Sequence, residues 1–162
     1  MEIKRAFIHG LESSGNGAKG TFFRKRYPDM IVEDFSGPFA ARMEKLEQLL
    51  AGADPLILVG SSYGGLMAAV YACRRPDRVK KMVLLAPALH LEPFASDDNA
   101  LLPMPVHIIH GAHDDVVPLD SIVGIARRRF MSLTFTETND GHLLHETFGR
   151  LEWDELLEIS TP

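Results

Sequence analysis

With 162 residues, 46% of them apolar and 24% charged, the chain has the size and composition of one soluble globular domain with its own core. Its net charge of −5 argues against a nucleic-acid partner, because phosphate groups favour a basic surface. The single cysteine, Cys73, cannot form an internal disulfide and lies in an apolar stretch, so we interpret it as a small core residue.

The N-terminal residues lead directly into a short strand-like segment and lack the apolar region and cleavage site of a signal peptide. No apolar run approaches the length needed to cross a bilayer. We therefore expect a cytoplasmic protein without a membrane span.

The first part of the chain alternates short apolar runs with helix-like stretches. Ala6–Ile8 is expected to be a strand, followed by a glycine-rich loop and a helix over Ala18–Arg26. Met30–Val32 is the next strand, and apolar residues at helical spacing then predict a helix with one buried face over Phe39–Leu50. Ala51–Pro55 ends that helix.

The same alternation continues towards the C-terminus. The expected elements are, in order, a strand at Leu56–Val59, a helix at Tyr63–Arg74, strands at Met82–Leu85 and Val106–Ile109, a helix at Leu119–Phe130 and a strand at Leu133–Phe135. The tail from His142 to Ile159 is expected to be largely helical, with a candidate break at Gly149.

Continuous apolar strands joined through helices are typical of a parallel sheet covered on both faces. The sequence therefore predicts an α/β fold, a three-layer doubly wound sandwich of about six mostly parallel strands with helices on both faces. Residues 1–162 contain no linker or repeat and are expected to form a single domain. Such a sheet binds its ligand at the carboxyl ends of its strands, and every motif described next follows a strand.

The strongest motif is the segment 60–64, which matches the G-x-S-x-G pattern of a nucleophile elbow. In that structure a sharp strand-to-helix turn exposes a serine, and glycines are needed because a Cβ would crowd the turn. Ser62 is the candidate nucleophile, at a helix N-terminus that favours developing negative charge. The alternative is an ordinary glycine-bearing turn with a capping serine.

A serine nucleophile needs a base and a third group that orients the base. His142 follows the last strand and is the candidate base, with His145 one turn later as its rival. Asp114 follows the strand before and is the candidate acid, with Asp115 as its rival. Each also has a structural alternative, a surface histidine and a helix-capping aspartate.

The two histidines that flank the candidate acid, His110 and His113, are interpreted as loop-stabilising residues. No carboxylate or cysteine partner completes a zinc pattern around them, so we expect no metal ion. The chemistry assigned to the candidate residues also needs no cofactor, and we expect none.

An oxyanion hole needs two N–H donors near the nucleophile. The backbone N–H of Tyr63, directly after Ser62, is the first candidate. The second is the N–H of Leu11, in the loop after the first strand. Because both donors belong to the main chain, the side chain at Leu11 carries little information about this role.

These motifs resemble those of the α/β-hydrolase superfamily, in particular its compact serine esterases and thioesterases, and the resemblance covers essentially the whole chain. The matching segments are His9-Gly10 for the oxyanion loop, residues 60–65 for the elbow, residues 110–118 for the H-G-x-x-D-x-x-V-P acid loop and Gly141-His142 for the histidine loop. Nucleophile, acid and base also follow the family's chain order. The resemblance implies a minimal hydrolase fold and hydrolysis of a small carboxylic ester or thioester through an acyl-enzyme.

The segment from residue 86 to residue 105 is too short for the cap domain that larger relatives carry. His90, Leu91, Pro93 and Phe94 could form only a small lip over the site. Leu91 and Phe94 are candidates for lining an acyl pocket, with packing in the lip or core as an equal alternative. An uncapped site buries less of its ligand, which weakens the selection of a large substrate.

Two rival hypotheses come from other classes. Gly15, Gly17 and Gly20 match G-x-G-x-x-G before a helix, and Glu33 and Asp34 lie at about the spacing of a ribose-binding acid, which favours a dinucleotide site. However, the first glycine of that fingerprint should end the strand, and here a loop segment intervenes. The second rival is a catalytically inert hydrolase fold used only for binding, because fold does not fix function.

Overall fold

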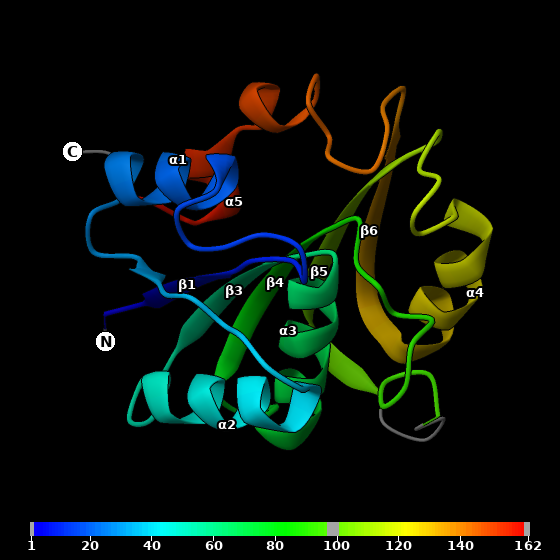
Figure 1. The fold of residues 1–162 in the computed structure, drawn as a ribbon. Coiled ribbons are helices and arrows are strands. Elements are labelled where there is room, and N and C mark those ends of the chain that lie inside the picture. Colours follow the sequence, from blue (N-terminus) through cyan, green and yellow to red (C-terminus); the bar gives the residue numbers. More distant parts are fainter. Residues whose placement is uncertain (1, 97–100, 161–162) are drawn as a thin grey trace.

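A computed structural model describes residues 2–96 and 101–160, and in that part six strands form one sheet (Figure 1). The strands are β1 (Lys4–Ile8), β2 (Ile31–Val32), β3 (Leu56–Ser61), β4 (Val79–Leu85), β5 (Leu102–Gly111) and β6 (Phe130–Thr138). Their order across the sheet is β2-β1-β3-β4-β5-β6, and every neighbouring pair is parallel. The predicted α/β fold with about six parallel strands is confirmed.

Helices connect the strands and cover both faces of the sheet. They are α1 (Ala18–Arg26), α2 (Phe39–Leu49), α3 (Tyr63–Arg74), α4 (Leu119–Arg129) and α5 (Trp153–Leu156), with a short 3₁₀ helix, η1 (Phe148–Arg150). Helices α1 and α5 lie side by side on one face, whereas α2, α3 and α4 pack on the other (Figure 1). This is the predicted three-layer sandwich.

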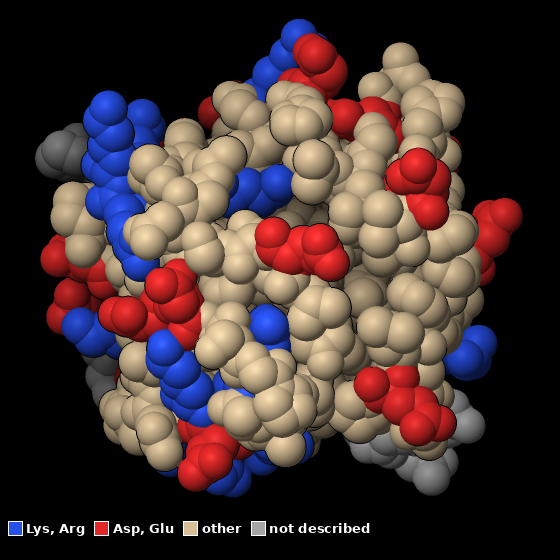
Figure 2. All heavy atoms as spheres, in the orientation of Figure 1, with Lys and Arg blue, Asp and Glu red and all other residues tan. Residues whose placement is uncertain are grey.

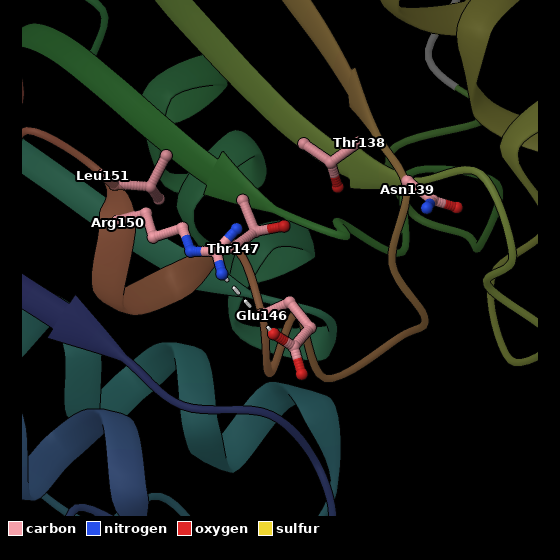
Figure 3. Close-up of a pocket in the computed structure, with 6 residues that line it drawn as sticks. All are labelled: Thr138, Asn139, Glu146, Thr147, Arg150 and Leu151. Carbon is pink, nitrogen blue, oxygen red and sulfur yellow. Dashed lines mark ion pairs between the residues drawn. The ribbon is translucent and has the colours of Figure 1, made fainter.

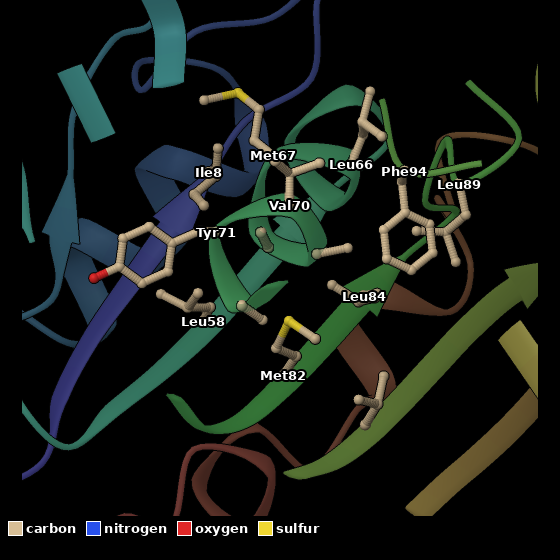
Figure 4. Close-up of a cluster of buried hydrophobic side chains, with 14 of the residues drawn as sticks. Ile8, Leu58, Leu66, Met67, Val70, Tyr71, Met82, Leu84, Leu89 and Phe94 are labelled. Atoms are coloured by element: carbon tan, nitrogen blue, oxygen red, sulfur yellow. The ribbon is translucent and has the colours of Figure 1, made fainter. Parts of the chain in front are cut away.

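The central strands are buried on both faces, which explains their continuous apolar sequences. In β3, Leu58 packs with α2 and α3, while Ile57 and Val59 pack with α1 and α5. The larger of the two core clusters surrounds α3, where Met67 and Tyr71 are fully buried (Figure 4). Because α3 is enclosed in this way, the turn at its N-terminus has a fixed position.

The direction of the strand order reverses at β1. The chain runs from β1 to β2 on one side and then returns to pair β3 on the other side of β1. In open α/β sheets, ligands bind outside the carboxyl ends of the strands at such a reversal. The loops that follow β1 and β3 meet at this edge of the sheet.

The C-terminal tail differs from the sequence-based prediction. Within residues 142–159 only η1 and α5 are helical and the remainder forms turns, so the prediction of a largely helical tail is wrong. The physical reason is tertiary: Phe148 and Trp153 pack edge-on against the aromatic rings of Phe22 and Phe23 in α1. Anchoring both rings on α1 favours two short helical turns over one continuous helix.

Strand β5 begins at Leu102 rather than at the predicted Val106. Prolines at positions 103 and 105 argue against a regular strand there. The pairing with β6 shifts register between Leu102 and Pro105, and this irregularity accommodates the prolines within the sheet.

Candidate active site

Ser62 lies at the turn between β3 and α3 and has an unusual backbone conformation. Its φ of 55° and ψ of −113° fall in a region that residues other than glycine rarely adopt. The Ser62 N–H donates to the carbonyl of Leu85 at 2.9 Å, and the Ser62 carbonyl accepts the N–H of Ala88 at 3.0 Å. The loop after β4 therefore fixes the turn that carries the serine.

The glycines of this turn let β1, β3 and α3 approach one another closely. A Cβ on Gly64 would collide with the carbonyl oxygen of Ile8 and lie 2.6 Å from that of His9. A Cβ on Gly60 would lie 2.7 Å from the Cα of Gly65. The G-x-S-x-G segment thus forms a strand, a sharp turn and a helix, and no side chain fits at these two glycines.

The structure brings Ser62, His142 and Asp114 together in one hydrogen-bonded chain. His142 Nδ1 lies 2.7 Å from Asp114 Oδ2, and His142 Nε2 lies 3.1 Å from Ser62 Oγ. Because an ionised carboxylate only accepts hydrogen bonds, Nδ1–H is the donor and Nε2 is left to accept the serine hydroxyl. The rival residues Asp115 and His145 are both exposed, and this chain does not include them.

The carboxylate of Asp114 is buried, and N–H donors surround it. Its side chain has 0% exposure. Oδ1 accepts the N–H groups of Val116 at 2.9 Å and Val117 at 2.7 Å, while Oδ2 accepts His142 Nδ1–H and lies 3.3 Å from His110 Nε2. A buried charge is tolerated when it is paired in this way, and these donors also fix the orientation of the carboxylate.

His110 is buried beneath the acid loop and stabilises it. Its Nε2–H donates to the carbonyl of Val117 at 2.7 Å, and burial lowers the pKa of His110, so the ring is neutral at pH 7. Among the described residues, no group pairs with its buried Nδ1. His113 donates to Asn139 Oδ1 at 2.7 Å and links the same loop to the histidine loop. Both histidines therefore have the loop-stabilising contacts predicted for them.

Asp140 fixes the loop that carries His142. Its Oδ1 accepts the Gly141 N–H at 2.8 Å, and its Oδ2 accepts the Thr147 hydroxyl at 2.8 Å, the Thr147 N–H at 2.9 Å and the Glu146 N–H at 3.0 Å. Partial burial alone would raise the pKa of Asp140, but these hydrogen bonds outweigh it and lower the pKa. The sequence predicted no role for Asp140, although an Asp-Gly pair before the candidate base is a turn signal.

His9 orients the loop that follows β1. Its Nε2 accepts the N–H of Phe35 at 2.8 Å, so the proton is on Nδ1, which donates to the carbonyl of Gly10 at 2.7 Å. The same carbonyl accepts the N–H of Ser13 at 3.2 Å. The peptide unit between Gly10 and the following residue is thereby fixed in direction.

The N–H of Leu11 belongs to the same planar peptide unit as the Gly10 carbonyl and points in the opposite direction. This loop lies against the serine, because a methyl group built on Gly10 would lie 3.5 Å from the Cβ of Ser62. Tyr63 is the first residue of α3, and its N–H has no carbonyl one turn earlier within the helix. The two candidate oxyanion donors therefore belong to the two segments next to Ser62, the loop after β1 and the start of α3.

The lip after β4 contains one exposed and one buried candidate. Leu91 is 38% exposed. Phe94 is 1% exposed, its ring stacks on Phe130, and the Arg129 guanidinium lies 4.0 Å from its centroid and donates to its carbonyl at 2.6 Å. Phe94 thus packs in the core and anchors the lip, as in the packing alternative.

The glycine-rich segment 15–20 packs against other parts of the protein. Gly15 N–H donates to Asp34 Oδ1 at 2.6 Å, so the candidate ribose-binding acid is already engaged. A Cβ on Gly20 would lie 2.7 Å from the carbonyl carbon of Gly15, and the side chain of Arg24 bonds to Asn16. Close packing between the loop and α1 therefore accounts for these glycines without a dinucleotide.

A hollow of about 420 Å³ lies behind the histidine loop (Figure 3). Its lining residues are Thr138, Asn139, Glu146, Thr147, Arg150 and Leu151. They come from the end of β6 and from the segment that runs to the residue after η1, with an ion pair of 3.8 Å between Arg150 and Glu146. Ser62 is not among the residues that line this hollow.

The described residues contain neither a metal-binding cluster nor a membrane-crossing helix. In residues 2–96 and 101–160, no three His, Cys, Asp or Glu side chains are grouped so that they could coordinate a metal ion. The helices in the same ranges lack the length and apolarity needed to span a bilayer.

Comparison with protein families gives a match to the alpha/beta hydrolase fold over residues 10–104. Homoserine O-acetyltransferase of Thermus thermophilus is 30% identical over 82 residues, which is 51% of this chain and 20% of that protein. The human 1-acylglycerol-3-phosphate O-acyltransferase ABHD5 is 27% identical over 107 residues, 65% of this chain and 29% of that protein. The alignments therefore span less than a third of these curated relatives.

Solved structures share the fold along nearly the whole chain. Mouse alpha/beta hydrolase domain-containing protein 10 has a TM-score of 0.75 at 20% identity, covering 96% of this chain and 89% of that one. An alpha-beta serine hydrolase homologue from Coxiella burnetii has a TM-score of 0.74 at 18% identity, covering 97% and 85%. Est1E from Butyrivibrio proteoclasticus, with ferulic acid bound, has a TM-score of 0.74 at 13% identity, covering 98% and 87%.

Proposed function

The chain belongs to the α/β-hydrolase family, and on that premise we propose that it is a serine hydrolase that cleaves small-molecule carboxylic esters or thioesters. The observation that most supports this is the hydrogen-bonded chain from Ser62 through His142 to Asp114, with distances of 3.1 and 2.7 Å. Nucleophile, base and orienting acid have the contacts and the histidine tautomer that acyl transfer requires.

In the first half-reaction Ser62 Oγ attacks the substrate carbonyl carbon while His142 Nε2 takes the hydroxyl proton. The N–H groups of Leu11 and Tyr63 stabilise the oxyanion, and Asp114 stabilises the imidazolium. The bond from the carbonyl carbon to the leaving oxygen or sulfur then breaks, and the leaving group takes the proton from His142. The product of this step is an acyl ester of Ser62.

In the second half-reaction a water molecule replaces the serine. His142 Nε2 takes a proton from water, and the water oxygen bonds to the acyl carbon. The bond to Ser62 Oγ breaks, and the serine recovers its proton from His142.

Acyl transfer to an alcohol is the second candidate within the same chemistry. The names of the two curated relatives, an O-acetyltransferase and an O-acyltransferase, favour considering it. The acyl-enzyme is common to both reactions, and only the acceptor differs. Product analysis with and without added glycerol or homoserine distinguishes them, since transfer yields a new ester at the expense of free acid.

The experiment that tests the proposal is active-site labelling with a fluorophosphonate, located by mass spectrometry. Native protein should be labelled at Ser62, and heat-denatured protein should not, because only the folded site activates the hydroxyl. Ser62→Ala should abolish labelling, whereas Ser61→Ala, one residue earlier, should retain it. Absence of labelling in the native protein, or labelling that survives Ser62→Ala, contradicts the proposal and favours an inert binding protein.

A further inference from the structure

Large exposed apolar side chains are concentrated on the loops at the edge of the sheet where Ser62 lies. In the described part of the chain six such residues are exposed, namely Leu11 (53%), Leu91 (38%), Leu101 (59%), Val116 (61%), Met131 (66%) and Leu143 (55%). Leu101 and Met131 lie at the amino ends of β5 and β6, at the opposite edge of the sheet. The other four lie on the four loops around the candidate site. Single exposed apolar residues are ordinary, but a cluster around one site indicates a binding surface.

Two of these residues are chain neighbours of residues at the candidate site. Leu143 is next to His142 in the chain, and Leu11 is next to Gly10, whose Cα carries no side chain beside Ser62. A methyl group on Gly10 would lie 3.5 Å from the Cβ of Ser62, so the Leu11 loop is in contact with the nucleophile. Both side chains are more than half exposed.

Backbone hydrogen bonds link the other two residues to the candidate acid and, through Ala88, to the backbone of the nucleophile. Val116 donates its N–H to Asp114 Oδ1 at 2.9 Å. Leu91 donates its N–H to the carbonyl of Ala88 at 3.3 Å, and the Ala88 N–H donates to the carbonyl of Ser62 at 3.0 Å. We call Leu11, Leu91, Val116 and Leu143 together the apolar rim.

The charges next to the apolar rim are mainly negative. Glu12 follows Leu11, Glu92 follows Leu91, and Asp115 precedes Val116, and all three acidic residues are exposed. Lys19 also lies here, but its ammonium donates to the Leu143 carbonyl at 2.8 Å, so a hydrogen bond already engages it. Figure 2 shows a largely uncharged surface around the centre of this view, with a group of acidic atoms and with basic atoms above and below that group.

We propose that the apolar rim binds the hydrocarbon chain of a medium- or long-chain acyl group whose leaving group carries no negative charge, an inference that rests on the proposed function. The ester carbonyl is positioned at Ser62, so a chain attached to it must cross the rim, where contact removes apolar surface from water. The three carboxylates disfavour an anionic leaving group by repulsion. Because the rim is open, each added methylene increases kcat/KM by less than the about fourfold expected for full burial.

The first test compares p-nitrophenyl esters from acetate to dodecanoate, below their aggregation concentrations. The double variant Leu91→Gln/Leu143→Gln should lower the dodecanoate-to-acetate ratio of kcat/KM about tenfold or more, since two contact side chains become polar. Val116→Thr keeps the shape of the side chain and should also lower this ratio. It therefore provides a test of the rim even if the double variant misfolds. Met131→Gln is the matched control for an exposed apolar residue and should leave the ratio as in the wild type.

The second test compares S-dodecanoyl-coenzyme A with S-dodecanoyl-N-acetylcysteamine, which share the acyl chain and the scissile bond. The neutral thioester should be cleaved with a kcat/KM about tenfold higher at low salt, and added salt should narrow the difference because it screens the carboxylates. Glu92→Gln and Asp115→Asn should also reduce the difference in kcat/KM between the two thioesters, because each removes a negative charge. Equal rates for the two thioesters, or a preference for the coenzyme A ester, overturn the charge part of the proposal.

A binding measurement separates failure of this inference from failure of the proposed function. Ser62→Ala protein should bind a fluorescent dodecanoyl methyl ester saturably in a polarisation titration, and the double rim variant should weaken that binding about tenfold. If the rim variant weakens binding but the native protein shows no Ser62-dependent turnover, the proposed hydrolase function is refuted and the inference about the apolar rim is retained. If turnover depends on Ser62 but the rim variants do not change the dodecanoate-to-acetate ratio of kcat/KM, the proposed function is retained and the inference about the apolar rim is refuted.

Discussion

Replacing Asp114 with asparagine changes one oxygen of the candidate acid to an NH₂ group, and the structure determines which one. Oδ1 accepts two backbone N–H groups, from Val116 and Val117, at 2.9 and 2.7 Å. An asparagine keeps both bonds only if its carbonyl oxygen takes the Oδ1 position. Its NH₂ group must then face His142 Nδ1, where the carboxylate oxygen now lies at 2.7 Å.

The consequence is an inverted histidine tautomer. An NH₂ group donates, so His142 Nδ1 must become the acceptor and the proton moves to Nε2. A protonated Nε2 cannot accept the Ser62 hydroxyl proton, so across the 3.1 Å contact it can only donate a hydrogen bond to Ser62 Oγ. Comparable substitutions in serine proteases lower kcat by about four orders of magnitude, which corresponds to about 5 kcal/mol in the activation barrier.

The assay is kcat and KM for p-nitrophenyl butyrate, with thermal unfolding measured on the same samples. Asp115→Asn is the matched control, because it makes the same chemical change on the neighbouring, exposed residue. We expect a severe loss for Asp114→Asn and a mild change for Asp115→Asn. A loss of less than tenfold at position 114, or a larger loss at 115 than at 114, would refute the tautomer argument.

Two further predictions concern the loops around the site. Gly64→Ala should reduce the free energy of unfolding by about 3 kcal/mol or more, since its Cβ would collide with the Ile8 carbonyl, whereas Gly149→Ala, with open space around it, should have little effect in the same denaturant titration. Asp140→Asn should reduce both kcat and thermal stability at pH 7, because it weakens the contacts that fix the His142 loop. The pKa of Asp140 is lowered in the folded state, so the ionised carboxylate stabilises the fold above the unfolded value of 3.8, and this stabilisation is lost as the pH falls through the folded pKa. The Asp140→Asn variant should therefore lose less stability than the wild type over that acidic range. An equal loss in the two proteins would contradict this prediction.

The order of strands and helices could be predicted from the sequence because most elements are buried on one or two defined faces. Leu56–Val59 is continuously apolar since both of its faces are covered, and α2 shows its buried side through Met43 and Leu46. The tail was mispredicted because its conformation depends on aromatic contacts with α1, which helical periodicity does not report. The apolar pattern of the sequence predicted the elements whose own residues are buried on a regular face. It did not predict the tail, whose conformation depends on contacts with a distant helix.

The same distinction applies to the candidate site. Ser62, Asp114 and His142 could be nominated because each follows a strand, and parallel strands bring their carboxyl ends to one edge. The sequence could not distinguish the roles of Leu91 and Phe94, since both are apolar. The burial of Phe94 and its contacts with Phe130 and Arg129 show that it is turned into the core. The role of Asp140 depends on N–H groups later in the chain, whose position follows from the fold of the loop.

The members of the candidate triad come from parts of the sheet with unequal protection. Ser62 follows β3 in the middle of the sheet, whereas His142 follows β6, which pairs with β5 alone at the edge. Edge elements usually open at a lower free energy than central ones, in small cooperative units. A transient opening of β6 would withdraw the candidate base while the serine turn stayed intact, so the proposed activity depends on an edge strand. Reinforcing that edge would extend the active lifetime without altering the nucleophile.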